Sequence, residues 1–122
     1  MNKYPVNENS FLDEKAESFY LLGAYFADGN IRTKKHNKII SISSCDEDWL
    51  IGIKNIICPT KPIYKRGANC FALEISNQKV LDWLVSYGCV PNKSKTARLT
   101  KSIPKQYQSH FLRGLFDRRW FC

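Results

Sequence analysis

An acidic residue at the end of an apolar helix is the feature of this sequence best suited to chemistry. Apolar residues recur at three- and four-residue steps from Ser10 to Asp28, which predicts a helix that ends at Asp28. Gly29 follows, and we expect it to stop the helix in the left-handed conformation that glycine tolerates. The carbonyl end of a helix disfavours a carboxylate, and a divalent cation would offset that cost. Asp28 is therefore a candidate metal ligand.

Small residues on the same helix favour a second helix as its neighbour. Gly23 and Ala27 lie four positions apart on one face, so the backbone of a partner helix can approach closely. A symmetric pair would bring two carboxylates equivalent to Asp28 together, where they can hold Mg²⁺ against a scissile phosphate. The alternative is an ordinary core helix that ends in Asp-Gly, a common turn dipeptide.

Positive charge is concentrated in two stretches of the chain. The formal net charge is +8, and most lysines and arginines fall within Arg32–Arg66 and Lys93–Arg119. Asp117 is the only acidic residue after Gly88. Such a distribution attracts a polyanion, which indicates a nucleic acid, although a basic surface can also serve solubility alone. The five cysteines lack the paired spacing of a zinc site.

The elements that position Asp28 follow in a repeating order. Hydrophobic periodicity predicts helix, strand, strand, helix, strand, strand, helix, then a basic linker at 91–104 and a last helix at Gln106–Phe116. The intermediate elements are strands at 30–38 and Ile39–Ser43, a helix that begins with a capping box of Ser44 and Glu47 and ends before Pro59, strands at Pro62–Arg66 and Cys70–Ile75, and a helix that Ser76 or Asn77 caps and Gly88 ends.

Two segments of the chain resemble one protein family. Leu21–Gly29 resembles the LAGLIDADG signature, which it matches at its leucine, its glycine and its closing Ala-Asp-Gly. Phe111–Asp117 is similar to the second such helix in double-motif members of the LAGLIDADG homing endonucleases. Between them, Gly88–Thr96 and Lys101–Pro104 resemble the linker that precedes the second motif, so the resemblance covers nearly the whole chain.

The resemblance implies a fold and a division of the chain. The fold would be α+β, with an αββαββα half that contains a saddle-shaped, antiparallel four-stranded sheet. Residues 1–90 would form this half-domain, residues 91–104 a basic linker, and residues 105–122 the start of a second LAGLIDADG repeat.

The chain departs from the family at its end. Arg118–Trp120 stands where double-motif members continue Gly-Asp-Gly, so the second acidic residue is missing. One nucleotide inserted before a run that codes for Gly-Asp-Gly-Ser-Val would yield the observed Arg-Arg-Trp-Phe-Cys. We therefore expect Arg118–Cys122 to be the frameshifted end of a longer, two-motif ancestor, truncated within the second motif.

The resemblance implies a metal-dependent, site-specific double-stranded DNA endonuclease with Mg²⁺ as cofactor. Asp28 would be the catalytic metal ligand, and Ala27 would contribute through its backbone carbonyl. Lys101 resembles a lysine that family members place near the active site, where it could polarise water or stabilise phosphorane charge, and Lys93 competes for this role. The helix-pair interface would comprise Gly23, Ala27 and, in the second motif, Gly114.

DNA recognition in this family uses outward side chains of the sheet, which lie in the major groove. The strand and turn residues with suitable chemistry are Asn30, Arg32, Lys34, Lys35, Lys38, Ser41, Ser43, Tyr64, Lys65, Arg66 and Asn69. Alternation alone does not decide which face each of them occupies.

The expected partners are double-stranded DNA and, for cleavage, a second copy bound through the Gly23 and Ala27 face. The last helix could instead fold back onto that face, which would leave a monomer with one aspartate that binds DNA or RNA without cutting, as an inactive remnant or a maturase-like module. We expect no membrane partner and no small-molecule cofactor. Met1–Ser10 lacks a secretory signal, which indicates a cytoplasmic protein.

Overall fold

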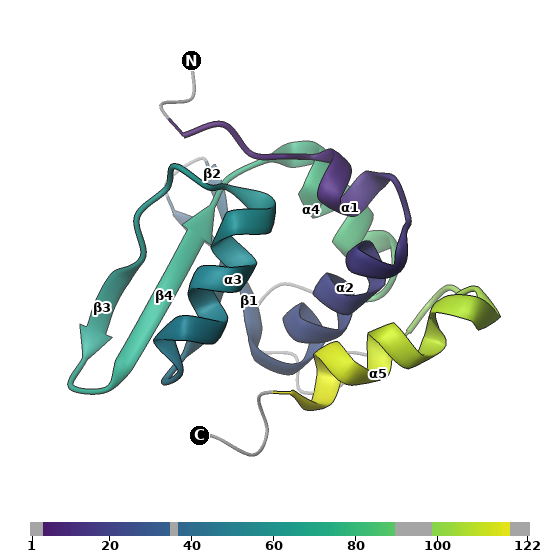
Figure 1. Ribbon diagram of the computed structural model, residues 1–122. Coiled ribbons are helices and arrows are strands. Elements are labelled where there is room, and N and C mark those ends of the chain that lie inside the picture. The colour runs from purple at the N-terminus through teal and green to yellow at the C-terminus, as the bar shows by residue number, and fades with distance from the viewer. Residues whose placement is uncertain (1–3, 35–36, 90–98, 118–122) are drawn as a thin grey trace.

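The computed structural model describes residues 4–34, 37–89 and 99–117. Helices pack against one four-stranded antiparallel sheet in an α+β arrangement, and the predicted order of elements is confirmed (Figure 1). The elements are α1 (Asn9–Leu12), α2 (Ala16–Asp28), β1 (Gly29–Lys34), β2 (Asn37–Ser44), α3 (Glu47–Ile57), β3 (Tyr64–Gly67), β4 (Cys70–Ile75), α4 (Gln78–Ser86), the 3₁₀ turn η1 (Lys105–Tyr107) and α5 (Gln108–Phe116).

The sheet has one apolar face and one polar face. Its strand order is β1-β2-β4-β3. Ile40 of β2 lies opposite Ile31 of β1 and Ile75 of β4, and all three are buried in the core. Side chains alternate between faces along each strand, so the register also defines the opposite face, here called the outer face. It carries Asn30, Arg32, Ile39, Ser41, Ser43, Tyr64, Ala72 and Glu74.

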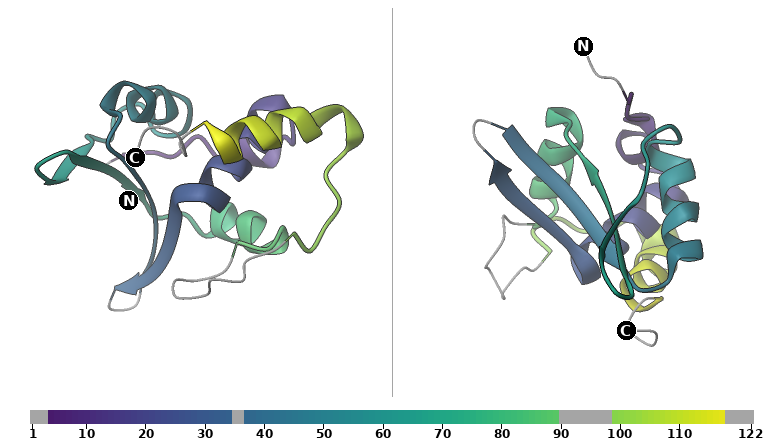
Figure 2. Two further views of the ribbon diagram at one scale, coloured as in Figure 1. Left: turned by 90° about the horizontal axis from the view of Figure 1, so that it is seen from below. Right: turned by 90° about the vertical axis from the view of Figure 1, so that its left-hand side faces the viewer.

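The helices bury their apolar stripes against the inner face of the sheet. α3 contacts β2 and β4, and α2 contacts β1 and β2. In the left view of Figure 2, α3 and α5 lie on the same side of the curved ribbon that β1 and β2 form. Leu50 and Ile53 of α3 and Phe19 and Leu22 of α2 belong to the same core cluster, so the helices and the sheet share one core.

The predicted helix at Ser10–Asp28 is interrupted, which corrects the sequence-based expectation. α1 ends at Leu12 and α2 begins at Ala16. Between them Glu14 adopts a left-handed backbone conformation with φ of 53°. Its carboxylate accepts hydrogen bonds from the indole of Trp83 (3.0 Å) and the hydroxyl of Tyr87 (2.8 Å). These tertiary hydrogen bonds compensate for a backbone conformation that is rare outside glycine.

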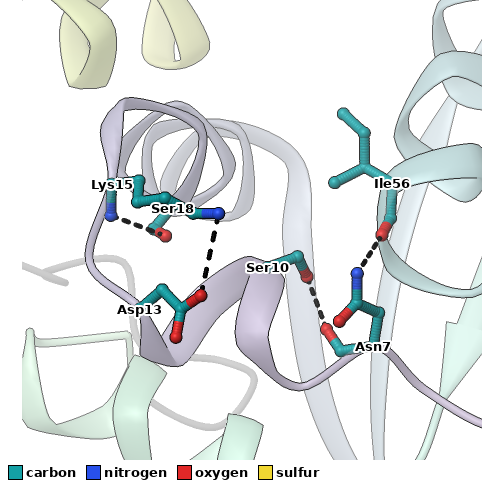
Figure 3. Close-up of polar contacts among 6 residues, drawn as sticks. All are labelled: Asn7, Ser10, Asp13, Lys15, Ser18 and Ile56. Carbon is teal, nitrogen blue, oxygen red and sulfur yellow. Dashed lines mark hydrogen bonds and ion pairs between the residues drawn. The ribbon is translucent and has the colours of Figure 1, made fainter.

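Polar contacts fix the start of α2 and join the N-terminal segment to α3 (Figure 3). The backbone N–H of Lys15 donates to the hydroxyl of Ser18 (3.0 Å), and the Lys15 ammonium lies 3.7 Å from the Asp13 carboxylate. The side-chain amide of Asn7 donates to the carbonyl of Ile56 near the end of α3 (3.3 Å). The segment before α2 is therefore held at both ends.

Two helix starts test the predicted caps. The capping box of Ser44 and Glu47 is wrong, because the cap of α3 is Asp46, whose carboxylate accepts from the Trp49 N–H at 3.1 Å. The Ser44 hydroxyl instead accepts from the Asp46 N–H at 2.7 Å and so orients the capping residue. At α4, Asn77 is the cap and accepts from the Val80 N–H at 3.0 Å, which is one of the two residues predicted.

Gly29 is required for a different reason from the one predicted. Its φ of −81° and ψ of 161° are extended, so the chain passes directly from α2 into β1 without a left-handed residue. A Cβ atom at this position would lie 2.5 Å from the carbonyl oxygen of Tyr25. The close return of the chain over the last turn of α2 therefore excludes any side chain.

No helix within the described part of the chain is both long enough and apolar enough to span a bilayer.

The Glu14 carboxylate should make stability depend on pH. The hydrogen bond from Tyr87, with that from Trp83 and the charge of Lys101, lowers the pKa of Glu14. A lowered folded-state pKa adds stability above the unfolded value and loses it as the pH falls through the folded value. We expect the unfolding free energy, measured by urea titration, to fall more steeply between about pH 5 and pH 3 in the wild type than in Glu14→Gln.

The matched control for this prediction is Glu17→Gln, because Glu17 is exposed in the first turn of α2. That variant should retain the wild-type pH profile. Superimposable profiles for Glu14→Gln and the wild type would contradict the assignment.

Candidate helix pair and nucleic-acid interface

Asp28 lies where the first long helix meets the sheet. It is the last residue of α2, as predicted, and it is partly buried. β1 begins at the next residue, and Asn30, two positions on, is exposed on the outer face. The sequence therefore brings one carboxylate to the edge of the surface that carries the predicted DNA-binding residues.

α5 packs against α2 and covers the face that contains Gly23 (Figure 1). A Cβ atom added to Gly23 would lie 2.1 Å from the carbonyl oxygen of Phe111, and one added to Gly114 would lie 2.0 Å from that of Tyr20. Both distances are far inside van der Waals contact. Only glycine at these two positions allows the backbones to approach so closely. Ala27, the third predicted interface residue, is partly buried one turn after Gly23.

The contacts of the two glycines are related by an internal repeat. Gly114 follows Gly23 by 91 positions (114 − 23), and the same offset relates Phe111 to Tyr20. Gly23 approaches the carbonyl of Phe111, and Gly114 approaches the carbonyl of Tyr20. Exchanging the two helices therefore reproduces the same backbone contact.

Side-chain contacts obey the same exchange. The Tyr20 hydroxyl donates to the Asp117 carboxylate at 2.6 Å, and the ring of Phe26 meets that of Phe111 edge-on at 5.6 Å. Adding 91 to 20 and 26 gives 111 and 117, so each contact is the counterpart of the other. The two helices thus pack as a pseudo-two-fold pair although the residue types differ.

A hydrogen-bonded chain ties the helix pair to α3. The indole N–H of Trp49 donates to the Tyr20 hydroxyl at 2.8 Å, and Tyr20 in turn donates to Asp117. Partial burial, together with the bond to Asp117, raises the pKa of Tyr20 to about 12. Tyr20 is therefore neutral at physiological pH and can donate and accept at once.

The counterpart of Asp28 in this repeat is Arg119, at position 28 + 91. Arg119 lies outside the described residues, as do Arg118–Cys122 as a whole and the predicted site residues Lys35 and Lys93. Because α5 covers the Gly23 face, a homodimer through that face would require α5 to leave it.

Lys101 is not brought to Asp28. Its ammonium lies 4.5 Å from the ring centroid of Tyr87, and its charge acts on Glu14. Glu14 precedes α2 and Asp28 ends it, and the helix of 13 residues spans about 20 Å. Lys101 therefore lies at the opposite end of α2 from the carboxylate it was expected to assist, where its visible role is to stack on Tyr87.

The predicted DNA-binding residues fall into two groups. Asn30, Arg32, Ser41, Ser43 and Tyr64 share the outer face. The remaining described residues lie on the inner-face register or at strand ends. Lys38 follows the register of Ile40, Lys65 lies opposite Phe71, Lys34 lies opposite Asn37, and Arg66 and Asn69 are exposed near the β3–β4 turn.

A charged network that the sequence did not identify crosses the outer face. Glu74 of β4 accepts hydrogen bonds from the guanidinium of Arg32 and, at 2.8 Å, from the hydroxyl of Tyr64. Arg32 comes from β1 and Tyr64 from β3, so three strands meet at one carboxylate. Ser41, directly opposite Glu74, is only 1% exposed, so it does not reach a base in this conformation. The sequence offered one signal for this network, which is an acidic residue that alternates with apolar residues in a predicted strand.

Two residues of the predicted metal centre, Asp28 and Ala27, lie within the described part of the chain. Asp28 and the carbonyl of Ala27 are oxygen donors of the kind that Mg²⁺ binds, beside water and phosphate. Among residues 4–34, 37–89 and 99–117, no three His, Cys, Asp or Glu side chains are grouped so that they could hold one metal ion. A complete two-aspartate centre would need a second acid at the position that Arg119 occupies in the repeat.

Comparison of the chain with protein-family models, with curated proteins and with solved structures finds no match.

The glycine crossing should be essential for α5 to dock. Gly23→Ala must displace the carbonyl of Phe111, which costs about 1–3 kcal/mol of unfolding free energy in urea titrations. Gly114→Ala should have a similar effect. Gly52→Ala in α3 is the control, because its Cβ would meet nothing within 4 Å and should stabilise the helix by up to about 1 kcal/mol. An unaffected Gly23→Ala variant would contradict the crossing.

Proposed function

We propose that this chain is a half of a LAGLIDADG-type, metal-dependent and site-specific DNA endonuclease, and that it binds double-stranded DNA through the outer face of its sheet. Asp28 supplies one of the two carboxylates that cleavage requires. The observation that carries the proposal is the pseudo-two-fold packing of α2 and α5, which starts from Gly23 and Gly114 in the two motif segments.

Charge and shape support DNA as the partner. The chain carries a net charge of +8, and exposed Lys65 and Arg66 extend along the β3–β4 hairpin. Outer-face side chains such as Asn30 and Arg32 have the donors and acceptors that base edges recognise. An antiparallel sheet with a polar face is one of the structures that fit the major groove.

A second half of the protein would complete the site. Leu112 and Phe116 of α5 are 49% and 43% exposed, on a helix that already packs against α2. In the proposed enzyme this apolar surface supports a second sheet. Because this chain has arginine at position 119, its second acid would be Asp28 of another copy, in a homodimer for which α5 leaves the Gly23 face.

A second candidate function follows from the position of α5. With α5 on the Gly23 face and arginine at the counterpart of Asp28, the chain binds nucleic acid without cutting it. Such a binding module could act on DNA, as a remnant of the enzyme, or on RNA, as a maturase does. Relative affinity for duplex DNA and for an RNA hairpin distinguishes these two alternatives.

Duplex DNA should bind with a salt dependence set by the hairpin. We expect Lys65→Ala/Arg66→Ala to weaken binding of a labelled random-sequence duplex, measured by anisotropy. The slope of log K against log salt should become shallower by about 1.8, because two phosphate contacts are lost.

The control is Lys15→Ala/Lys79→Ala, which removes the same charge from exposed positions near the starts of α2 and α4. The salt slope of this control should differ from that of the wild type by less than about 0.9, which is the contribution of one phosphate contact. Equal slopes for both double variants would refute the hairpin as the contact surface, and preference for an RNA hairpin over the duplex would favour the maturase-like candidate.

Restoring the acid should restore metal binding. We expect Arg118→Gly/Arg119→Asp/Trp120→Gly to bind Mn²⁺ in titration calorimetry more tightly than the wild type, because two carboxylates then share one cation. Adding Asp28→Asn should abolish the gain. Duplex binding should persist in all of these variants, and a gain that survives Asp28→Asn would remove Asp28 from the proposed centre.

A further inference from the structure

The centre of the outer face contains a carboxylate, whose negative charge repels the phosphates of the proposed DNA ligand. Glu74 lies on β4, and its side chain is 22% exposed, on a protein with a net charge of +8. Taken alone, an acid on a DNA-binding surface repels phosphate and weakens association. Its position at the middle of the face calls for a role that compensates for this cost.

The partners of Glu74 indicate that role. Arg32 pairs with Ile39 of β2, while Glu74 pairs with Ser41, so the Arg32–Glu74 ion pair passes across β2 between these two residues. The Arg32 side chain is 31% exposed, which leaves part of the guanidinium open to a ligand. Tyr64 holds the same carboxylate from the other side through its hydroxyl.

We propose that Glu74 is a specificity-determining positioning residue, which orients the Arg32 guanidinium so that it recognises a guanine in the major groove. This inference rests on the proposed DNA-binding function. Arginine has five N–H donors in a rigid planar fork, and Glu74 uses only part of them. The remaining donors match O6 and N7 of guanine, the commonest arginine contact to a base.

Glu74 also limits non-specific attraction. Without Glu74, the guanidinium can bind phosphates of any DNA sequence, which adds affinity but no base preference. With it, the guanidinium charge is partly compensated, and its geometry is set before the DNA arrives. The carboxylate thus trades overall affinity for discrimination, as specificity through an opposing charge requires.

The test selects duplexes from a randomised library with the wild type, Glu74→Gln and Glu17→Gln, and measures affinities for the enriched and random duplexes by anisotropy. We expect the wild type and Glu17→Gln to share a G·C preference on the order of tenfold or more at one position. Glu74→Gln should lose that preference. Its affinity for random duplex should be equal or higher, with a salt slope steeper by about 0.9.

A second variant guards against misfolding of the first. Arg32→Lys keeps the charge but lacks the planar fork, so it should lose the same G·C preference while its salt slope stays at the wild-type value. Unfolding titrations verify that each variant is folded.

The outcomes separate this inference from the proposed function. Duplex binding with an unchanged base preference in Glu74→Gln would overturn the role of Glu74 and leave DNA binding intact. A wild type that binds duplex without any base preference would also overturn it. Failure of the wild type to bind duplex at any salt would overturn the proposed function, and this inference with it.

Discussion

The close approach of α2 and α5 at Gly23 and Gly114 is the constraint on which the rest of the structure depends. Each glycine accommodates a backbone carbonyl of the other helix at a distance no side chain allows. The two helices can therefore bury their facing surfaces fully, and Phe19 and Phe111 take part in the core. Because β1 begins directly after Asp28 and α2 contacts β1 and β2, Asp28 lies at the edge of the sheet. The crossing adds α5 to this arrangement.

Electrostatics organise the sheet in a comparable way. The net positive charge of the chain attracts any polyanion, so attraction by itself distinguishes no sequence. In the proposed complex with DNA, the ion pair of Arg32 with Glu74 would add discrimination, because it orients the donors of the guanidinium. The hydroxyl of Tyr64 donates a hydrogen bond that holds the Glu74 carboxylate in place. Partial burial and this bond raise the pKa of Tyr64, which keeps the hydroxyl protonated. The network thus links β1, β4 and β3 at their exposed surface.

The sequence predicted the order of elements because periodicity reports burial, and burial here follows the strands and helices closely. It failed where tertiary contacts override local preference. Glu14 breaks the first helix because groups on and just after α4 donate to its carboxylate, and these groups are some seventy positions away in the chain (|i−j| of 69 and 73). Lys101 was placed by resemblance, but its ammonium stacks on the ring of Tyr87, a tertiary contact that local pattern does not encode. The Glu74 network required the strand register, since an ion pair across β2 depends on three strands at once.

The internal repeat shows which positions must be the same in both helices for packing and which can differ. At the crossing the two helices must both have glycine, because the backbone of each fills the space of a Cβ. One turn away the counterparts Phe26 and Asp117 differ, yet each still contacts the residue equivalent to the other's partner, through a ring in one case and a hydrogen bond in the other. Packing therefore tolerates a change of chemistry wherever a side chain can reach. Asp28 follows the crossing, so the glycine contact that holds the pair together does not depend on the acid at this position. The packing of the helix pair therefore does not depend on the acid at the end of α2, whereas the proposed cleavage activity does.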